Sequence, residues 1–347
     1  MATLRTAKQL CDHNLALPER RVALDAVAAR YAVALPPALA DLIDANDPHD
    51  PIARQFVPDA AELDHRPEEL NDPIGDDAHS PVEGIVHRYP DRVLLLPTHA
   101  CAVYCRFCFR RERVGPGAEA LTPDQLERAL AYVAGDPRIW EVILSGGDPL
   151  VLSPRRLAAI VERLDRIPHV QVIRVHTRVP ALDPARVGDE LVAALAARKA
   201  LWVVLHVNHA RELELGAREA CARIARAGIP MLAQTVLLAG VNDEPSALEE
   251  LFRALVAMRV KPYYLHHLDR APGTARFRTS LAAGQELVRG LRGRVSGLCQ
   301  PTYVLDLPGG AGKVPVGPSD AGECVDGVRA LRDWQGKTHR WSEREDG

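Results

Sequence analysis

Residues 92–108 read RVLLLPTHACAVYCRFC, an apolar run that leads directly into three closely spaced cysteines. The run Arg92–Pro97 predicts a β-strand, since a short continuous apolar run is typical of a strand buried on both faces. Behind it, Cys101, Cys105 and Cys108 form the pattern CxxxCxxC. Three thiolates on one short loop can bind three irons of a cubane iron–sulfur cluster, whereas ferredoxin-type sites use four cysteines. The fourth iron would stay open for another ligand, so the stretch predicts a strand followed by a cluster-binding loop.

A zinc site with His99 or His87 as a fourth ligand is the alternative interpretation of these cysteines. The spacing is unusual for zinc, which prefers paired CxxC elements. A set of inert, buried cysteines fits less well, because Arg106, Arg110 and Arg111 make the segment polar. We therefore favour the cluster.

A strand-and-helix rhythm continues from this first strand through most of the sequence. Apolar runs predict further strands at Glu141–Ser145, Val172–His176, Leu201–Val207, Met231–Leu237 and Pro262–His266. Helical patterns follow them at Thr122–Ala134, Pro154–Arg166, Pro184–Arg198, Glu212–Ala227, Ser246–Met258 and Leu281–Arg292. Six βα units in a row predict an α/β fold with a parallel sheet, whose chemistry lies at the carboxyl ends of the strands. The motif positions favour a barrel-like sheet over an open doubly wound one.

The first 90 residues differ from this pattern. Leu17–Ala45 has helical spacing interrupted by prolines, and a polar stretch rich in Pro, Asp and His follows from Asn46 to Pro81. We predict three parts: residues 1–90 as a helical extension and linker, residues 91–320 as the barrel with a C-terminal cofactor-binding segment, and residues 321–347 as a tail.

Composition and charge argue against several classes of protein. The chain has 347 residues, a formal net charge of −3 and a pI of about 6.5. No basic field therefore predicts nucleic-acid binding, and no apolar run reaches the roughly 18 residues of a membrane span. The N-terminus lacks a signal-peptide apolar region, and an odd count of seven cysteines does not fit a disulfide framework. We expect a cytoplasmic protein with a small-molecule ligand.

Two glycine-rich elements are further candidates for ligand binding. The second predicted strand ends in Ser145-Gly146-Gly147-Asp148, where backbone could approach a ligand closely and present exposed N–H and C=O groups. An ordinary turn is the alternative. Near the C-terminus, Lys313 ends a glycine-rich loop that follows a strand. It is either a solvent-facing lysine or an amine that reaches a cofactor carbonyl.

Taken together, these motifs resemble the lysine 2,3-aminomutase family of the radical S-adenosylmethionine (SAM) superfamily. The resemblance runs from about residue 82 to residue 318 and includes Thr177–Pro180, Met231–Asp243, Lys261–His266 and Pro308–Lys313. It implies a partial (βα)6 radical SAM barrel with a helical N-terminal extension. It also implies a 4Fe–4S cluster on the three cysteines, SAM on the open iron, and pyridoxal 5′-phosphate (PLP).

The resemblance implies specific cofactor contacts. Lys313 would form the internal aldimine with PLP, and Arg88 and Arg92 would bind PLP through its phosphate, with a solvated basic pair as the alternative. SAM would be contacted by Ser145, Gly146, Gly147, Asp148, His206 and Gln234. A histidine at a strand end can also be only a satisfied core residue.

The substrate would lie between one cation and two carboxylates. Arg110 matches the family position that pairs with the substrate α-carboxylate, a task suited to guanidinium. Asp269 and Asp306 match the carboxylates that bind the ε-ammonium of lysine, and two anions disfavour a distal carboxylate. Alternatively, Asp269 pairs with Arg270 and Asp306 caps a turn. Lysine is therefore the favoured substrate, and ornithine and arginine are the alternatives.

The implied reaction moves the α-amino group of L-lysine to the β-carbon and gives β-lysine. A 5′-deoxyadenosyl radical takes a hydrogen from the β-carbon, nitrogen migrates through a cyclic radical on the PLP imine, and the hydrogen returns. The cluster would need an electron donor such as flavodoxin or ferredoxin. The competing hypotheses are a radical SAM enzyme without aminomutase activity and a zinc-stabilised binding protein.

The sequence departs from the larger members of this family at their structural zinc site. Those members carry a cysteine directly after the Val-Asn-Asp element and a C-terminal cysteine cluster. In this sequence Glu244 follows the element, and no cysteine follows Cys324. The shorter tail resembles the branch that makes β-lysine for elongation factor P. The product's fate and the oligomeric state, including a homo-oligomer, remain open.

Overall fold

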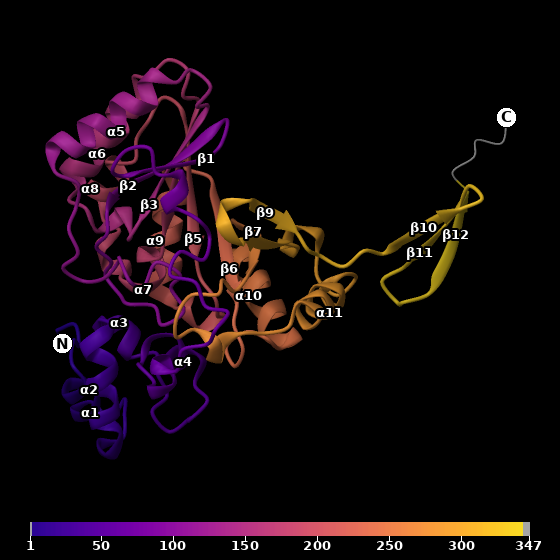
Figure 1. The fold of residues 1–347 in the computed structure, drawn as a ribbon, viewed down its shortest axis with the longest axis horizontal. Helices are drawn as coiled ribbons and strands as arrows, with labels where there is room; N and C mark the ends of the chain where they lie inside the picture. Colours follow the sequence, from indigo (N-terminus) through magenta and orange to yellow (C-terminus); the bar gives the residue numbers. More distant parts are fainter. Residues whose placement is uncertain (1, 343–347) are drawn as a thin grey trace.

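The structure, a computed structural model, describes residues 2–342, and within them the central feature is a nine-stranded sheet in the order β1 to β9 (Figure 1). Strands β2 to β8 are parallel, while β1 and β9 pair antiparallel at the two edges. The strands are β1 (Ile85–Tyr89), β2 (Arg92–Thr98), β3 (Glu141–Gly146), β4 (Val172–Thr177), β5 (Ala200–His206), β6 (Met231–Leu237), β7 (Val260–His267), β8 (Thr302–Leu307) and β9 (Gly312–Pro315). The predicted α/β barrel class is confirmed, and β8 extends its parallel part by one strand.

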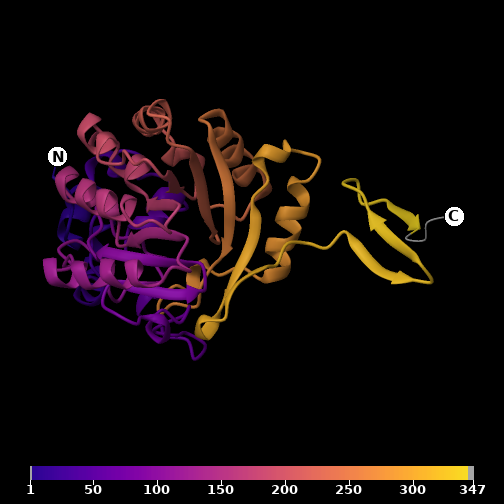
Figure 2. The same cartoon turned by 90° about the horizontal axis from the view of Figure 1, so that it is seen from above.

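Helices connect the parallel strands and cover the outside of the sheet (Figures 1 and 2). They are α5 (Pro123–Gly135), α6 (Pro154–Asp165), α7 (Val179–Leu182), α8 (Asp189–Ala193), α9 (Leu215–Arg226), α10 (Pro245–Ala257) and α11 (Leu281–Leu291). Thr122 caps α5 and Ser153 caps α6, each followed by Pro at the first helical position, as the sequence predicts. Buried side chains such as Val142 and Ile173 fill the space between helices and sheet.

Two predicted helices are wrong in their extent. The helix expected over Pro184–Arg198 is instead a 3-10 turn at Pro184–Arg186 followed by the short α8, because Gly188 has an extended backbone and interrupts the helical path. The helix expected from Glu212 begins at Leu215, because Glu212 belongs to a separate 3-10 turn. There its buried carboxylate accepts the N–H groups of Asn208 and His209 at 3.0 and 2.9 Å.

The N-terminal region contains four short α-helices, α1 (Ala7–Asp12), α2 (Arg21–Arg30), α3 (Pro37–Ala40) and α4 (Pro51–Phe56), beside one side of the barrel (Figure 1). Helix α4 lies in the stretch that was expected to be irregular. Its start follows ordinary capping rules, since Asp50 accepts the N–H groups of Ile52 and Ala53, and Pro51 is the first helical residue. Phe56 is buried against the barrel core.

The C-terminal tail forms a separate three-stranded sheet of β10 (Ala321–Val325), β11 (Val328–Arg332) and β12 (Thr338–Ser342). Figures 1 and 2 show it projecting away from the barrel on a single connecting segment. Every residue of β10 and β12 is exposed. Among residues 2–342, no helix has the length and apolar character to cross a bilayer.

Candidate active site

A cavity of about 510 Å³ lies inside the partial barrel and extends to the carboxyl ends of its strands. That volume is in the usual range for small-molecule sites. Most of the predicted site residues line it: Arg88, Arg92, Cys105, Cys108, Arg110, Ser145, His206, Gln234, Asp269, Asp306 and Lys313. Four predicted site residues are not part of its lining: Cys101, Gly146, Gly147 and Asp148. The fold therefore gathers side chains from segments that are more than 200 residues apart in the sequence.

The three cysteines of the predicted cluster loop are close enough to influence one another. Burial raises the pKa of Cys101 well above its usual value, and the neighbouring Cys108 and Cys105 raise it further. Burial and Cys105 raise the pKa of Cys108 to about 11. Three thiolates gathered in this way need a strongly positive centre to compensate their charge, as an iron–sulfur cluster provides.

The two histidines proposed as a fourth zinc ligand differ in their contacts. His87 bonds to the Tyr132 hydroxyl at 2.7 Å. His99 is half-buried, and burial lowers its pKa. Its Nδ1 has no hydrogen-bond partner in the described residues, so these contacts disfavour His87 but not His99. A cubane cluster separates its sulfur ligands more widely than a zinc ion, which lies about 2.3 Å from each sulfur.

A buried ion pair with the N-terminal region holds the cysteine loop in place. Arg106 donates to Glu62 with its Nε and Nη2 at 3.0 and 2.6 Å, and Arg111 also bonds to Glu62. All three side chains are fully buried. Burial alone would raise the pKa of Glu62, but Arg106 and Arg111 outweigh it and lower that pKa. Removing one partner of such a pair typically costs about 3–5 kcal/mol.

The paired glycines after β3 let two backbone segments approach each other. A Cβ on Gly146 would lie 2.4 Å from the Thr98 carbonyl oxygen, and one on Gly147 would lie 2.1 Å from that of Ala100. The N–H of Gly147 bonds to Thr98 and that of Asp148 bonds to Ala100, both at 2.8 Å. These two N–H groups were expected to be exposed for SAM, but they are used to join β3 to the start of the cysteine loop.

The Asp148 carboxylate faces the end of β4. It accepts the Thr177 hydroxyl at 2.8 Å, the backbone N–H of Arg178 at 2.7 Å and that of Leu150 at 3.0 Å. Burial raises its pKa, and these hydrogen bonds lower it in part. Asp148 therefore holds the Thr177-Arg178 corner in place.

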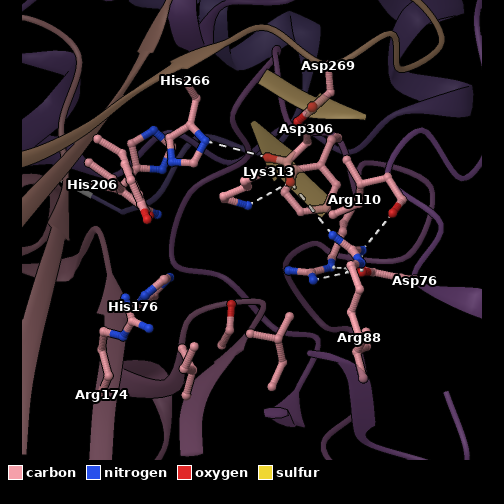
Figure 3. A pocket seen from close by; sticks show the side chains of 18 of the residues that line it. Asp76, Arg88, Arg110, Arg174, His176, His206, His266, Asp269, Asp306 and Lys313 are labelled. Carbon is pink, nitrogen blue, oxygen red and sulfur yellow. Dashed lines mark hydrogen bonds and ion pairs between the residues drawn. The ribbon is translucent and has the colours of Figure 1, made fainter. Parts of the chain in front are cut away.

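Lys313 lies opposite Asp306 in the hairpin formed by β8 and β9. The two residues are register partners, and the Lys313 Nζ donates to Asp306 Oδ1 at 2.7 Å (Figure 3). The backbone N–H of Lys313 donates to the Tyr89 hydroxyl at 2.7 Å. Gly312 has a φ of +96°, and a Cβ there would lie 2.9 Å from the Tyr89 hydroxyl. Lys313 is thus turned into the cavity and is not a solvent-facing loop lysine.

The two predicted ammonium-binding carboxylates differ in charge state. Burial raises the pKa of Asp306, but hydrogen bonding by His266 and the charge of Lys313 outweigh it and lower the pKa to about 2. Burial and the adjacent Asp306 raise the pKa of Asp269 to about 7. The turn-cap alternative for Asp306 is not what the structure shows, since its described partners are side chains around the cavity.

Arg88 and Arg110 converge on Asp76, a residue that the sequence analysis missed (Figure 3). Arg110 donates with its Nε and Nη2 to one Asp76 oxygen at 2.9 and 2.7 Å, and Arg88 donates to the other oxygen at 3.0 Å. All three side chains are nearly buried. The only indication in the sequence is an acidic run, Asp72 to Asp77, shortly before Arg88. That run belongs to no motif that we recognised.

Several buried polar atoms of the cavity have no hydrogen-bond partner within residues 2–342. They are the Nε atoms of Arg88 and Arg174 and the Nε2 atoms of His176, His206 and His266. Burial lowers the pKa of each of these three histidines, so their neutral forms are favoured. Arg92 lies over the Tyr89 ring at 4.0 Å and is about one-third exposed. A polar, anionic cofactor such as PLP fits a cavity with such unpaired donors.

Comparison with known proteins agrees with this arrangement. Residues 95–252 match the family model described as the Radical SAM superfamily, and residues 288–346 match the one described as Lysine-2,3-aminomutase. The first match contains the cysteine loop, and the second contains Lys313.

The full-length relatives include enzymes named for two different amino acids. The L-lysine 2,3-aminomutase of Acetoanaerobium sticklandii is 42% identical over 91% of this chain and 76% of its own. That of Clostridium subterminale is 41% identical over 90% and 75%. The glutamate 2,3-aminomutase of Clostridioides difficile is 35% identical over 90% and 74%. With both family matches and this degree of identity, the chain belongs to the lysine 2,3-aminomutase family of the radical SAM superfamily.

Proposed function

We propose that this protein is a radical SAM, PLP-dependent isomerase that moves the α-amino group of L-lysine to the β-carbon, giving β-lysine. The observation that carries the substrate assignment is the 2.7 Å contact between Asp306 and Lys313. In this contact the ammonium of the Lys313 side chain binds Asp306, which is one of the two carboxylates expected to bind the substrate ammonium. Lys313 thus stands in for the ε-ammonium of free lysine.

Family membership implies a 4Fe–4S cluster, SAM and PLP as cofactors. When bound, the cluster and SAM together supply one-electron chemistry that generates an organic radical, and PLP supplies an electrophilic carbon that carries the migrating nitrogen. Cys101, Cys105 and Cys108 would hold the cluster, and Lys313 would hold PLP. Engaging Lys313 with PLP frees Asp306 for the substrate.

The remaining cofactor contacts follow from the cavity lining. Ser145, His206 and Gln234 would contact SAM, since they line the same cavity as Cys105 and Cys108. An indirect role would fall to Gly146, Gly147 and Asp148, which would fix the backbone next to the cysteine loop. For PLP, Arg88 and Arg92 would bind the phosphate.

Charge and reach at the two ends of the substrate support lysine. Arg110 would bind the α-carboxylate, and Asp76 holds its guanidinium fork in place. Asp269 and Asp306 would bind the distal ammonium and repel the distal carboxylate of glutamate. The chain's own residues thereby orient the substrate along the cavity and exclude water from it. Ornithine and arginine are weaker candidates, because they place their cations at different distances.

We also propose a cytoplasmic location with flavodoxin or ferredoxin as the electron donor, because a low-potential cluster requires a reducing environment. The boundaries between the helical extension, the barrel and the tail would lie at residues 90 and 320, as predicted.

Anaerobic incubation of the reconstituted enzyme with SAM, reductant, PLP and a panel of amino acids, followed by product identification, tests this function. We expect β-lysine from lysine and no β-glutamate from glutamate. Asp306→Asn should reduce kcat/KM for lysine by a factor equivalent to about 2–5 kcal/mol, because a buried charge pair loses one partner. Asp136→Asn, at a partly buried aspartate outside the cavity lining, should leave it unchanged.

Two results would contradict the proposal. Equal loss of lysine turnover and SAM cleavage in Asp306→Asn would argue against an ammonium-binding carboxylate. SAM cleavage without any amino-group migration across the panel would support a radical SAM enzyme of another kind.

A further inference from the structure

The Thr177-Arg178-Val179-Pro180 corner contributes to the resemblance to the family, but the proposed function gives Arg178 no role. In the structure the Arg178 Nη1 donates to the Cys105 Sγ at 3.0 Å. The side chain is 9% exposed, so bulk water screens this contact very little. Arg178 therefore places a fixed positive charge beside one of the three cysteines.

Four other groups hold this guanidinium in one orientation. Its Nη2 donates to Glu212 Oε2 at 2.5 Å and to Gln55 Oε1 at 3.5 Å. The rings of Phe56 and Phe107 lie 5.0 and 5.4 Å from its centre. Both rings are buried, and cation–π contacts of this kind gain strength when water is excluded.

Glu212 is itself fixed, so it cannot follow Arg178 to another position. Its second oxygen accepts the N–H groups of Asn208 and His209 and the Gln55 amide at 3.1 Å. The side chain is fully buried. The arrangement is thus rigid on the side away from Cys105.

One donor of the guanidinium is left over. The buried Nε of Arg178 has no hydrogen-bond partner in the described residues. Several other arginines, including Arg111 and Arg278, share an unpaired Nε, so the feature specific to Arg178 is its Nη1 contact with Cys105. The unpaired Nε and the Nη1 that contacts Cys105 belong to the same guanidinium group.

We propose that Arg178 is a positioning residue that sets the reduction potential of the cluster through its hydrogen bond and positive charge at Cys105. This inference rests on the cluster assignment in the proposed function. The reduced cluster carries one more negative charge than the oxidised one, so a nearby cation stabilises the reduced state. Hydrogen bonds to ligand sulfurs act in the same direction. Arg178 therefore makes the one-electron reduction that precedes SAM cleavage easier.

The test compares Arg178→Gln with Arg278→Gln in anaerobically reconstituted full-length protein. Arg278 is a matched control, because it is also a mostly buried arginine but binds Glu68 and Glu69 and contacts neither a cysteine nor Glu62. Iron content and EPR-monitored redox titration are measured for each. At a fixed solution potential we expect the ratio of reduced to oxidised cluster to fall about tenfold in Arg178→Gln, equivalent to about 59 mV for one electron. Arg278→Gln should show the wild-type ratio.

An unchanged ratio in Arg178→Gln with full iron content would overturn the proposal. Should that variant fail to bind iron, wild-type protein grown with 15N-labelled arginine gives a second measurement. Pulsed EPR of its reduced cluster should show a nitrogen coupling that Arg178→Lys lacks. The absence of the coupling, or its persistence in Arg178→Lys, would overturn the proposal. Wild-type protein that binds no iron would instead contradict the cluster assignment itself.

Discussion

The cluster end of the site, around the cysteine loop, and the substrate end, around Asp306, differ in how firmly a charged side chain is held. At the cluster end, Arg178 is fixed by Glu212, Gln55 and two aromatic rings. At the substrate end, Asp306 is paired with Lys313, a residue expected to leave it when PLP binds. The fixed Arg178 keeps a constant positive charge beside the cluster loop. Asp306, in contrast, can exchange Lys313 for another cation. This difference suits electron transfer at one end and turnover of substrate at the other.

The largest expected effect comes from breaking the cluster end alone. Cys105→Ser removes one of the three iron ligands, so iron content and 5′-deoxyadenosine formation should fall to background. PLP binding should persist, because Lys313 and its partners belong to other strands. Visible absorbance of bound PLP and an iron assay on the same sample check this. Cys11→Ser, at a partly exposed cysteine of α1, should behave as wild type. Loss of PLP together with iron would mean that the two ends do not fold independently.

Breaking the substrate end should give the converse result. Lys313→Ala should remove the PLP absorbance that survives dialysis and abolish β-lysine formation, while the cluster forms with a normal iron content. Lys337→Ala, in the connection between β11 and β12, is the matched control and should keep both. A dialysis-resistant PLP absorbance in Lys313→Ala would show that another lysine carries the cofactor.

A smaller effect, on pH dependence, sharpens the contrast within the substrate end. Burial and Asp306 raise the pKa of Asp269 to about 7, so Asp269 is neutral below and ionised above that pH. Lysine keeps its ε-ammonium throughout, since the pKa of that group is about 10.4. The value of kcat/KM for lysine should therefore rise between about pH 6 and pH 8. Asp269→Asn should lack this rise, and a rise of equal size in that variant would assign it to a different group.

Much of the fold and of the site could be predicted from the sequence, because both depend on local patterns. Apolar runs and cap residues locate the parallel strands and most helices, and each motif at a strand's carboxyl end falls beside the cavity. The cysteine loop was found in this way, whereas Lys313, Asp269 and Asp306 were identified through the resemblance to the family. Of these three residues and the three cysteines, all but Cys101 line one cavity.

What the sequence did not predict are partners that come from distant segments. Asp76 reaches Arg110 from 34 residues away, and Arg178 reaches Cys105 from 73 residues away. No spacing rule connects such pairs, since the turns of the barrel bring them together. The hydrogen bonds that Gly147 and Asp148 donate to Thr98 and Ala100 were not predicted for the same reason, because the acceptors come from a distant segment.

The buried contact between Glu62 and the cysteine loop has a consequence for how the enzyme matures. Arg106 and Arg111 find their anion in a segment made long before them, and Arg178 finds Glu212 in a segment made after it. The loop thus acquires its shape only when chain on both sides of it has folded. We therefore expect iron delivery to act on an already folded polypeptide, so that a truncated barrel lacking the first 62 residues would be a poor recipient for the cluster.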